Sequence, residues 1–280
     1  MICAKRMNNV LLCKPTYFDV LEVKNPFMRG MLTVDHARAE AEWQAVCKAF
    51  QQAGVHIQVI EPVPGLEDMV FAANQSFVGL DQEDRAFMVP SVMLHESRRG
   101  EVPYYTEYFQ NLGYRIIDLA LDEGDYLEGG GDLLWNADWE FVWAGYGHRS
   151  TLGGVQAFAR IMGELSIPVQ LLELVNPTFY HLDTCLAPLT ADSIVLYPGA
   201  LAPDSLRELR SKVRTYEVTR EEALKMVCNG VSVNGRYITP VLTPSLERAL
   251  AKENVEPIVV DTSEFAKSGG SVCCLKMMLP

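Results

Sequence analysis

The chain has 280 residues, of which 49% are hydrophobic and 21% are charged, and its formal net charge is -12. This composition provides a large core and excludes an intrinsically disordered chain. The negative charge disfavours nucleic acid and anionic membranes as partners, and no stretch reaches the ~20 apolar residues of a membrane span. We expect one domain over residues 1–280.

The N-terminal segment has only a short apolar piece, residues 10–13, which is too short for a signal-peptide core and predicts a first strand. The seven cysteines are odd in number and scattered, without a zinc-type C-x-x-C pair. We therefore expect a reducing, cytoplasmic compartment and no metal site. Five thiols are expected to be inert core groups: Cys3, Cys13, Cys47, Cys185 and Cys228.

A helical pattern followed by a β-rich run occurs five times along the chain, with strand starts 42 to 59 residues apart. The first helix ends at Gly54, where a glycine cap is typical. The spacing predicts helices over 34–52, 104–112, 155–165, 205–212 and 244–252, and strands over 55–60, 114–119, 169–172, 215–218 and 257–261. This alternation indicates the α/β class.

A polar segment follows each of these strands. Asn74, Glu128, His181, Asn229 and Cys274 mark the five segments, at spacings of 54, 53, 48 and 45 residues. If the five units closed into a ring, the segments would meet at one centre. The pattern alone leaves an open doubly wound sheet as the competing arrangement, although no G-x-G-x-x-G follows the first strand.

The polar segments contain the groups of a cysteine-nucleophile enzyme with a cationic substrate. A thiolate attacks an electron-poor carbon, and a histidine moves protons to the leaving amine and from the incoming water. Carboxylates bind a planar cation such as a guanidinium through paired N–H···O contacts. The candidate groups are Asn74, Glu128, Asp132, His181, Asp183, Asn229 and Cys274.

Six motifs in order give the chain a resemblance to the guanidino-group-modifying superfamily. They are N-P-F-M at 25–28, D-M-V-F-A-A-N at 68–74, E-G-G-G-D at 128–132, G-Y-G-H-R at 145–149, F-Y-H-L-D-T at 179–184 and G-G-S-V-C-C-L at 269–275. Within that superfamily the chain resembles dimethylarginine dimethylaminohydrolase and arginine deiminase, and most closely arginine dihydrolase. The resemblance implies the pentein fold, an α/β propeller of five ββαβ-like units around a pseudo-fivefold axis.

The resemblance also implies a covalent mechanism that needs no metal or organic cofactor. Cys274 would attack the guanidinium carbon, and His181 would protonate the departing nitrogen and then activate water. Glu128 and Asp132 would hold the guanidinium, and we expect Asp183 either to contact the substrate or, slightly preferred, to hold His181. The residues implied at the amino-acid end of the substrate are Arg98 and Arg149 on the carboxylate, and Asn25.

Two positions depart from much of the superfamily. Deiminases and dimethylarginine hydrolases usually carry Asp where this chain has Asn74, whereas arginine dihydrolases carry Asn. Related chains often have His, Arg or Lys where this chain has Cys273, so Cys273 is either a passive neighbour or one half of a vicinal redox pair. The G-G-x-x-x-C-L spacing selects Cys274 as the nucleophile.

The implied reaction is hydrolysis of L-arginine to ornithine, carbon dioxide and ammonia. Dimethylarginine dimethylaminohydrolase and arginine deiminase, which form citrulline, remain alternatives in the same class. A non-catalytic pentein binding protein is the alternative of another class, and the Cys-His-carboxylate set argues against it. The expected partner is a small guanidino substrate, and association into a homo-oligomer stays open.

Overall fold

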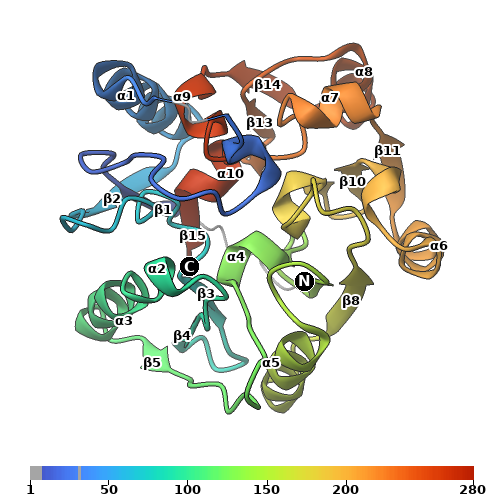
Figure 1. Cartoon of the computed structure of the whole chain (residues 1–280). Coiled ribbons are helices and arrows are strands. Elements are labelled where there is room, and N and C mark those ends of the chain that lie inside the picture. The colour runs from blue at the N-terminus through green and yellow to red at the C-terminus, as the bar shows by residue number, and fades with distance from the viewer. Residues whose placement is uncertain (1–7, 31–32) are drawn as a thin grey trace.

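The computed structural model describes residues 8–30 and 33–280, so Cys3 lies outside the described part of the chain. Within that part, five small sheets of three strands each surround a common centre (Figure 1). The predicted α/β class and the ring of five units are both confirmed. None of the helices in the described ranges has the length and apolar character that crossing a membrane requires.

Every sheet pairs its first strand with its second in antiparallel and its second with its third in parallel. The sheets are β3 (Ser76–Leu80), β4 (Ala86–Pro90) and β5 (Arg115–Ile116); β6 (Leu133–Trp135), β7 (Val142–Tyr146) and β8 (Val169–Glu173); β9 (Leu186–Thr190), β10 (Ser193–Leu196) and β11 (Arg214–Glu217); β12 (Val231–Val233), β13 (Arg236–Thr239) and β14 (Glu256–Val259); and β15 (Lys276–Leu279), β1 (Asn9–Cys13) and β2 (His56–Ile60).

The ring closes because strands from the two ends of the chain share one sheet. Asn9 of β1 lies opposite Leu279 of β15, and the antiparallel pairing continues to Leu12 and Lys276. The predicted strand at 10–13 is therefore the middle strand of the last unit. The open-sheet alternative is excluded by this pairing.

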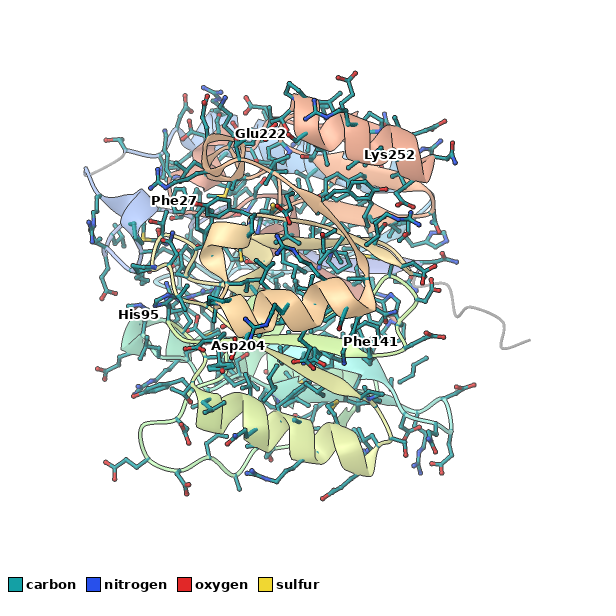
Figure 2. All side chains as sticks on the ribbon, turned by 90° about the vertical axis from the view of Figure 1, so that its right-hand side faces the viewer. Phe27, His95, Phe141, Asp204, Glu222 and Lys252 are labelled. Carbon is teal, nitrogen blue, oxygen red and sulfur yellow. The ribbon has the colours of Figure 1, made fainter. Side chains whose placement is uncertain are left out.

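One longer helix connects the second and third strands of each unit and lies at the rim of the ring. Figure 2 shows three of these helices stacked along the outside of the molecule. The predicted helices are confirmed with small shifts at their ends, whereas β5 is much shorter than the predicted strand at 114–119. The five helices are α1 (His36–Gln52), α3 (Val102–Asn111), α5 (Leu152–Glu164), α6 (Pro203–Lys212) and α8 (Pro244–Glu253).

Helix α5 illustrates how the rim helices are held. Thr151 caps its N-terminus by accepting a hydrogen bond from the backbone N–H of Gly154. Val155, Phe158 and Met162 lie on one face and are fully buried against strand β7. Truncating a buried Phe to Ala costs on the order of 3–5 kcal/mol, so this face fixes the helix to its sheet.

The polar segments predicted from the repeat lie between the outer strand of one unit and the inner strand of the next. Several form single helical turns that lead directly into an inner strand, which brings their side chains to the centre of the ring. The short helices are α2 (Glu96–Arg99), α4 (Gly129–Asp132), α7 (Arg220–Leu224), α9 (Ser263–Ala266), α10 (Val272–Leu275), η1 (Pro26–Met28), η2 (Leu182–Thr184) and η3 (Pro198–Ala200).

Candidate active site

A small cavity of about 20 Å³ lies at the centre of the ring, beside helix α10. Six of the predicted site residues line it: Asn25, Asn74, Arg98, Arg149, His181 and Cys274. Glu128 and Asp183 lie directly behind this lining, in contact with His181 and Cys274. The fold thus gathers residues from five distant segments around one cavity.

The thiol of Cys274 lies in a buried polar setting. It donates a hydrogen bond of 3.0 Å to Oδ2 of Asp183, and Nδ2 of Asn229 donates to its Sγ over 3.2 Å. Burial and the Asp183 carboxylate raise the pKa of the Cys274 thiol well above its ordinary value of 9.0. In the free protein Cys274 is therefore held as a thiol.

Asn229 fixes the backbone around the nucleophile. Its Oδ1 accepts hydrogen bonds from the N–H of Ser271 at 2.8 Å and of Cys274 at 3.4 Å, while its Nδ2 also donates to the carbonyl of Asp183. One buried amide thereby connects the Cys274 turn to the Asp183 turn. The repeat placed Asn229 in a polar segment, but none of the motifs assigned it a role. An amide side chain that only positions its neighbours cannot be recognised in the sequence by a reactive group.

The imidazole of His181 is oriented by Glu128. Nε2 of His181 lies 2.8 Å from Oε2 of Glu128, and Nη1 of Arg149 donates to the same oxygen over 2.8 Å. Burial by itself would raise the pKa of Glu128, but Arg149 and His181 bring it well below its ordinary value. Because the ionised carboxylate takes an N–H at Nε2, Nδ1 of His181 is left to exchange a proton with a reactant.

Asp132 does not reach the cavity, contrary to the expectation that it holds the guanidinium. Its Oδ2 accepts hydrogen bonds from the N–H and the hydroxyl of Ser150, and its Oδ1 accepts from the N–H of Leu182. Burial raises the pKa of Asp132 to about 6, although these donors and His181 oppose the rise. Its carboxylate therefore ties the Ser150 turn to the His181 turn.

Asp183 also differs from its slightly preferred role. Its carboxylate bonds to Cys274 and makes no hydrogen bond with His181. Burial raises its pKa above the ordinary value, and Oδ1 is buried without a hydrogen-bond partner among the described residues. This carboxylate oxygen lies beside Cys274 and lacks a hydrogen bond, so it can accept one from a cationic reactant.

Asn74 presents a donor to the site. Its Oδ1 accepts a hydrogen bond of 3.0 Å from Nη1 of Arg98, and its Nδ2 is buried without a partner among the described residues. Arg98 also binds Glu101 through two N–H groups, at 3.0 and 2.9 Å, and donates to the Asp68 carbonyl. One of its five N–H groups stays available to a ligand.

Arg149 and Asn25 are held by other parts of the chain. Besides Glu128, Arg149 donates to the carbonyl of Lys24 at 3.0 Å and stacks over the ring of Tyr180. Asn25 caps the η1 turn, and its Nδ2 donates to the carbonyl of Ser268 at 2.8 Å. Its side-chain amide therefore already forms hydrogen bonds within the protein. Any contact with a substrate would have to use the remaining N–H or the remaining lone pair of this amide.

Two charged residues in the lining carried no predicted role. Lys24 is buried and lies 3.0 Å from Oδ2 of Asp68 in an ion pair without hydrogen-bond geometry. Burial would lower the pKa of Lys24, but Asp68 and Glu67 raise it above the ordinary value. Asp68 opens a recognised motif and could have been selected from it, whereas Lys24 has no local signal.

Cys273 points away from this cavity and lines a different one. Burial raises its pKa to about 11, with Lys276 opposing the rise. Adjacent residues of a helical turn point about 100° apart, which directs these two thiols to separate spaces. The geometry favours Cys274 as the nucleophile and gives no support to a vicinal redox pair.

The described residues contain no group of three or more His, Cys, Asp or Glu side chains that could hold a metal ion. The donor set at the cavity is instead a thiol, an imidazole, carboxylates and guanidinium groups. Such a set performs nucleophilic and acid–base chemistry on a cationic carbon centre.

Comparisons with known proteins agree with this chemistry. A family model described as N,N dimethylarginine dimethylhydrolase, eukaryotic, matches residues 15–279. The N(G),N(G)-dimethylarginine dimethylaminohydrolase of Mycobacterium tuberculosis is 34% identical over 96% of this chain and 85% of its own. The bifunctional arginine dihydrolase/ornithine cyclodeaminase AgrE of Nostoc sp. is 32% identical over 95% of this chain, which spans only 37% of AgrE.

Among solved structures, the substrate-bound N-terminal domain of ArgZ, a cyanobacterial arginine dihydrolase, matches with a TM-score of 0.88 and 30% identity. The match covers 96% of this chain and 97% of that domain. Sequence and structure comparisons thus agree over nearly the full length. The chain belongs to the N,N dimethylarginine dimethylhydrolase family.

Proposed function

We propose that this protein is a guanidine hydrolase that converts L-arginine and two waters to ornithine, carbon dioxide and two ammonia. The arrangement that carries the proposal is the pair of unsatisfied buried atoms at the nucleophile, Oδ1 of Asp183 and Nδ2 of Asn74. The Asp183 oxygen is an acceptor for a guanidinium N–H. The Asn74 amide is a donor for an oxygen that arises later in the reaction.

The first half of the reaction begins when the cation binds beside Asp183. The positive charge offsets the carboxylate that raises the pKa of Cys274, so the thiol passes its proton to Nδ1 of His181 and thiolate forms where the substrate is bound. The thiolate attacks the guanidinium carbon, and the departing nitrogen takes a proton from Nδ1 of His181. The orientation of His181 by Glu128 supports this role.

Water, activated by the same imidazole, then cleaves the carbon–sulfur bond and leaves a ureido group. A ureido oxygen accepts a hydrogen bond where a guanidinium could only donate, so the amide of Asn74 suits this second species. If the ureido group is retained, a second attack by Cys274 on its carbon would release ornithine and leave a carbamoyl group on the sulfur. A second water would hydrolyse this carbamoyl group to carbon dioxide and ammonia and return the thiol. In keeping with covalent catalysis, a variant of the related ArgZ domain has been captured covalently bound to a reaction intermediate.

Arg98 and Arg149 are proposed to bind the carboxylate of the substrate through the N–H groups that the protein leaves free. Lys24, Asp68 and Asn25 lie at the same part of the lining. The reducing cytoplasm is the proposed location, because the nucleophile must stay a free thiol.

Hydrolysis of dimethylarginine to citrulline and dimethylamine is the second candidate, and the matching family model favours it. Product analysis separates the two. The protein is incubated with L-arginine and, separately, with asymmetric dimethylarginine, while ornithine, citrulline, ammonia and dimethylamine are quantified, with Cys274→Ser as control.

Ornithine and two ammonia per arginine, absent with Cys274→Ser, would establish the dihydrolase. Citrulline with one ammonia would keep the mechanism and reassign the enzyme as a deiminase, and dimethylamine would reassign it as a dimethylarginine hydrolase. Folded protein that transforms neither substrate would overturn the catalytic proposal.

A further inference from the structure

A second cavity, of about 240 Å³, lies among strands β3, β6, β12 and β15 and the segment 136–139. Its lining shares no residue with that of the catalytic cavity. In Figure 2, Phe27 of the η1 turn lies toward the left and Phe141, next to the 136–139 segment, lies to the right of the middle. Its volume is just below the ~300–1,000 Å³ typical of small-molecule sites, so it suits a compact ligand. We call it the back cavity.

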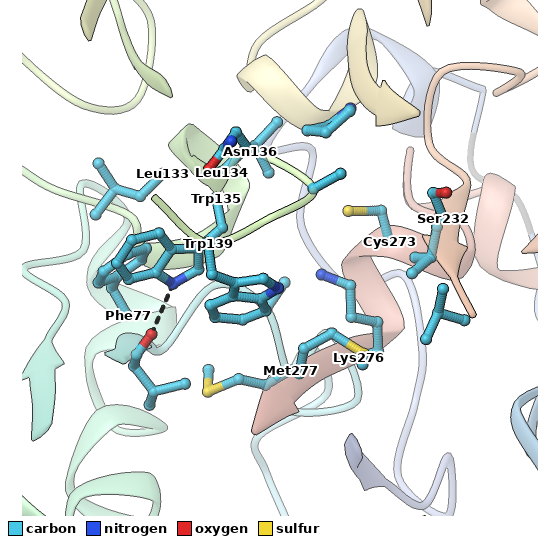
Figure 3. A pocket seen from close by; sticks show the side chains of 18 of the residues that line it. Phe77, Leu133, Leu134, Trp135, Asn136, Trp139, Ser232, Cys273, Lys276 and Met277 are labelled. Atoms are coloured by element: carbon cyan, nitrogen blue, oxygen red, sulfur yellow. Dashed lines mark hydrogen bonds between the residues drawn. The ribbon is translucent and has the colours of Figure 1, made fainter. Parts of the chain in front are cut away.

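One wall of the back cavity is a stack of aromatic rings. Phe77 stacks on Trp135 with ring centres 5.1 Å apart, and Trp135 lies against Trp139 at the same separation, with 30° between the ring planes in both pairs. The indole N–H of Trp135 is bound to the carbonyl of Val78 (Figure 3). Trp139 is the last ring of the stack and lines the cavity, where a planar ligand could extend it.

The lining also offers donors that lack an oxygen acceptor within the part of the chain that the structure describes. They are Nζ of Lys276, Nε1 of Trp139 and Nδ2 of the buried Asn136. Figure 3 shows Lys276 pointing into the same space as Trp139 and Cys273. The hydroxyls of Ser232 and Ser76 already donate, to Leu189 and Met277.

Lys276 is the group that decides which kind of ligand the back cavity suits. It is half-buried, and none of the described carboxylates lies within ion-pair distance of its ammonium. Asp138, the acidic residue in the lining, is exposed and does not pair with it. In a chain of net charge -12, a cation that forms no ion pair and lies at an aromatic wall suits an anion with a flat apolar body.

We propose that the back cavity binds a small aromatic carboxylate, with its ring on Trp139 and its carboxylate on Lys276. This site goes beyond the guanidino chemistry, because its ligand is an anion and binds in a cavity with a separate lining. The two cavities meet at helix α10, where Cys273 faces the ligand and Cys274 faces the reaction.

The test uses 2-naphthoate and its uncharged counterpart 2-naphthylmethanol as probes, with affinities measured by calorimetry and by quenching of tryptophan fluorescence. We expect saturable binding of naphthoate and weaker binding of the alcohol. Lys276→Met should weaken naphthoate about tenfold or more and leave the alcohol unchanged, since a hydrogen bond to a charged group has about that effect. Trp139→Leu should weaken both probes.

Three variants serve as controls. Lys276→Arg should retain the preference for the carboxylate, and Lys225→Met removes an exposed lysine elsewhere and should change nothing. Arg149→Met alters the catalytic cavity, so the affinity for naphthoate should not depend on it. Absence of saturable binding to the wild-type protein, equal affinity for both probes, or loss of binding in Arg149→Met but not in Lys276→Met would overturn the proposal.

A measurement on the wild-type protein avoids any folding defect of the variants. N-ethylmaleimide labelling of Cys273 and Cys274 is followed separately by fragment mass spectrometry, with and without 2-naphthoate. Selective protection of Cys273 is expected. Protection of Cys274 alone would place the probe in the catalytic cavity and contradict the proposal.

Discussion

The thiol of Cys274 donates its hydrogen bond to the carboxylate of Asp183, at 3.0 Å, in a site where both side chains are buried. This relationship opposes ionisation of the nucleophile, since a thiolate there would face a like charge in a desolvated setting. The enzyme at rest is thus unreactive, and a cation that binds Asp183 removes the obstacle. We therefore expect the reactivity of Cys274 to depend on the binding of the cationic substrate.

Asp183→Asn should therefore make the resting thiol more reactive and the enzyme less active. Without the adjacent negative charge the pKa of Cys274 falls toward its ordinary value, so iodoacetamide should alkylate Cys274 faster at a given pH near 8. Turnover should drop by about 10²-fold or more, because the guanidinium loses its acceptor. Alkylation that is slower than in the wild-type protein would contradict this account.

In the wild-type protein, alkylation of Cys274 should rise with pH beyond 9, the ordinary thiol value, because the folded-state pKa is raised. A guanidinium compound that fills the site without reacting should shift this profile to lower pH. The measurement is the alkylation rate against pH with and without the compound. An unchanged profile would mean that the cation does not lie beside Asp183.

Glu128→Gln should remove most of the activity by disorienting His181. General acid–base groups contribute about 10²–10⁴-fold to the reaction rate. A neutral amide at this position can neither stabilise the protonated imidazole of His181 nor neutralise the charge of Arg149. The variant should also be less stable at neutral pH, by about 3–5 kcal/mol, since Arg149 is left as an unpaired buried charge. Denaturant unfolding and turnover per folded molecule measure the two effects.

The sign of the pH effect follows from the lowered pKa of Glu128. Such a carboxyl contributes stability above its unfolded value of 4.5, and this contribution is lost as the pH falls below it. Glu128→Gln should thus lose less stability on acidification than the wild-type protein does. Glu42→Gln is the matched control, because Glu42 is a buried carboxylate that accepts hydrogen bonds from the Ser263 hydroxyl and the Glu264 N–H and does not line the cavity. It should leave turnover intact.

Asn74→Asp should change the products. The acidic side chain would act as a second acceptor for the guanidinium and offer no donor to the ureido oxygen, so the intermediate should leave after one hydrolysis. We expect citrulline to replace most of the ornithine. Ornithine as the main product of Asn74→Asp would show that the amide donor does not decide the number of hydrolytic steps.

Local patterns in the sequence predicted the five helices and the outer strands, since each depends on spacing within one unit. The choice of Cys274 as the nucleophile rests on a motif of the family and stays a prediction. Closure of the ring was not encoded in that way, because it depends on a pairing between Asn9 and Leu279. Except for the strand predicted at 10–13, which is β1, the first two strands of each unit were also missed. Some are as short as β6 and run on directly from a polar turn, so they lack a full alternating pattern.

The contacts of the two aspartates could not be predicted for a related reason. Asp132 and Asp183 both follow a motif residue by a few positions, and nothing local distinguishes them. In the fold, Ser150 donates a hydrogen bond to the Asp132 carboxylate, whereas the Asp183 carboxylate accepts one from the thiol of Cys274. Contacts between units decide which of the two carboxylates keeps an oxygen without a hydrogen bond. These contacts follow from tertiary packing alone.

Gly131 shows how tightly the catalytic groups are packed, and it supports the last prediction. A Cβ at this position would lie 2.6 Å from Nδ2 of Asn74 and 2.8 Å from Nδ1 of His181, the two atoms assigned to the reaction. Gly131 has no positive φ, so an alanine there causes crowding without backbone strain. Gly131→Ala should lower kcat by about 10²-fold, the effect of a misplacement near 1 Å.

Gly163 provides the matched control, since a Cβ there meets nothing within 4 Å and the residue lies in helix α5. Gly163→Ala should leave kcat unchanged and raise stability by about 0.5–1 kcal/mol, through the better helix propensity of alanine. Thermal unfolding of both variants separates crowding of the site from a general loss of stability. If Gly131→Ala kept full turnover, Asn74 and His181 would have room to move, and the precise placement argued for them would not be required for catalysis.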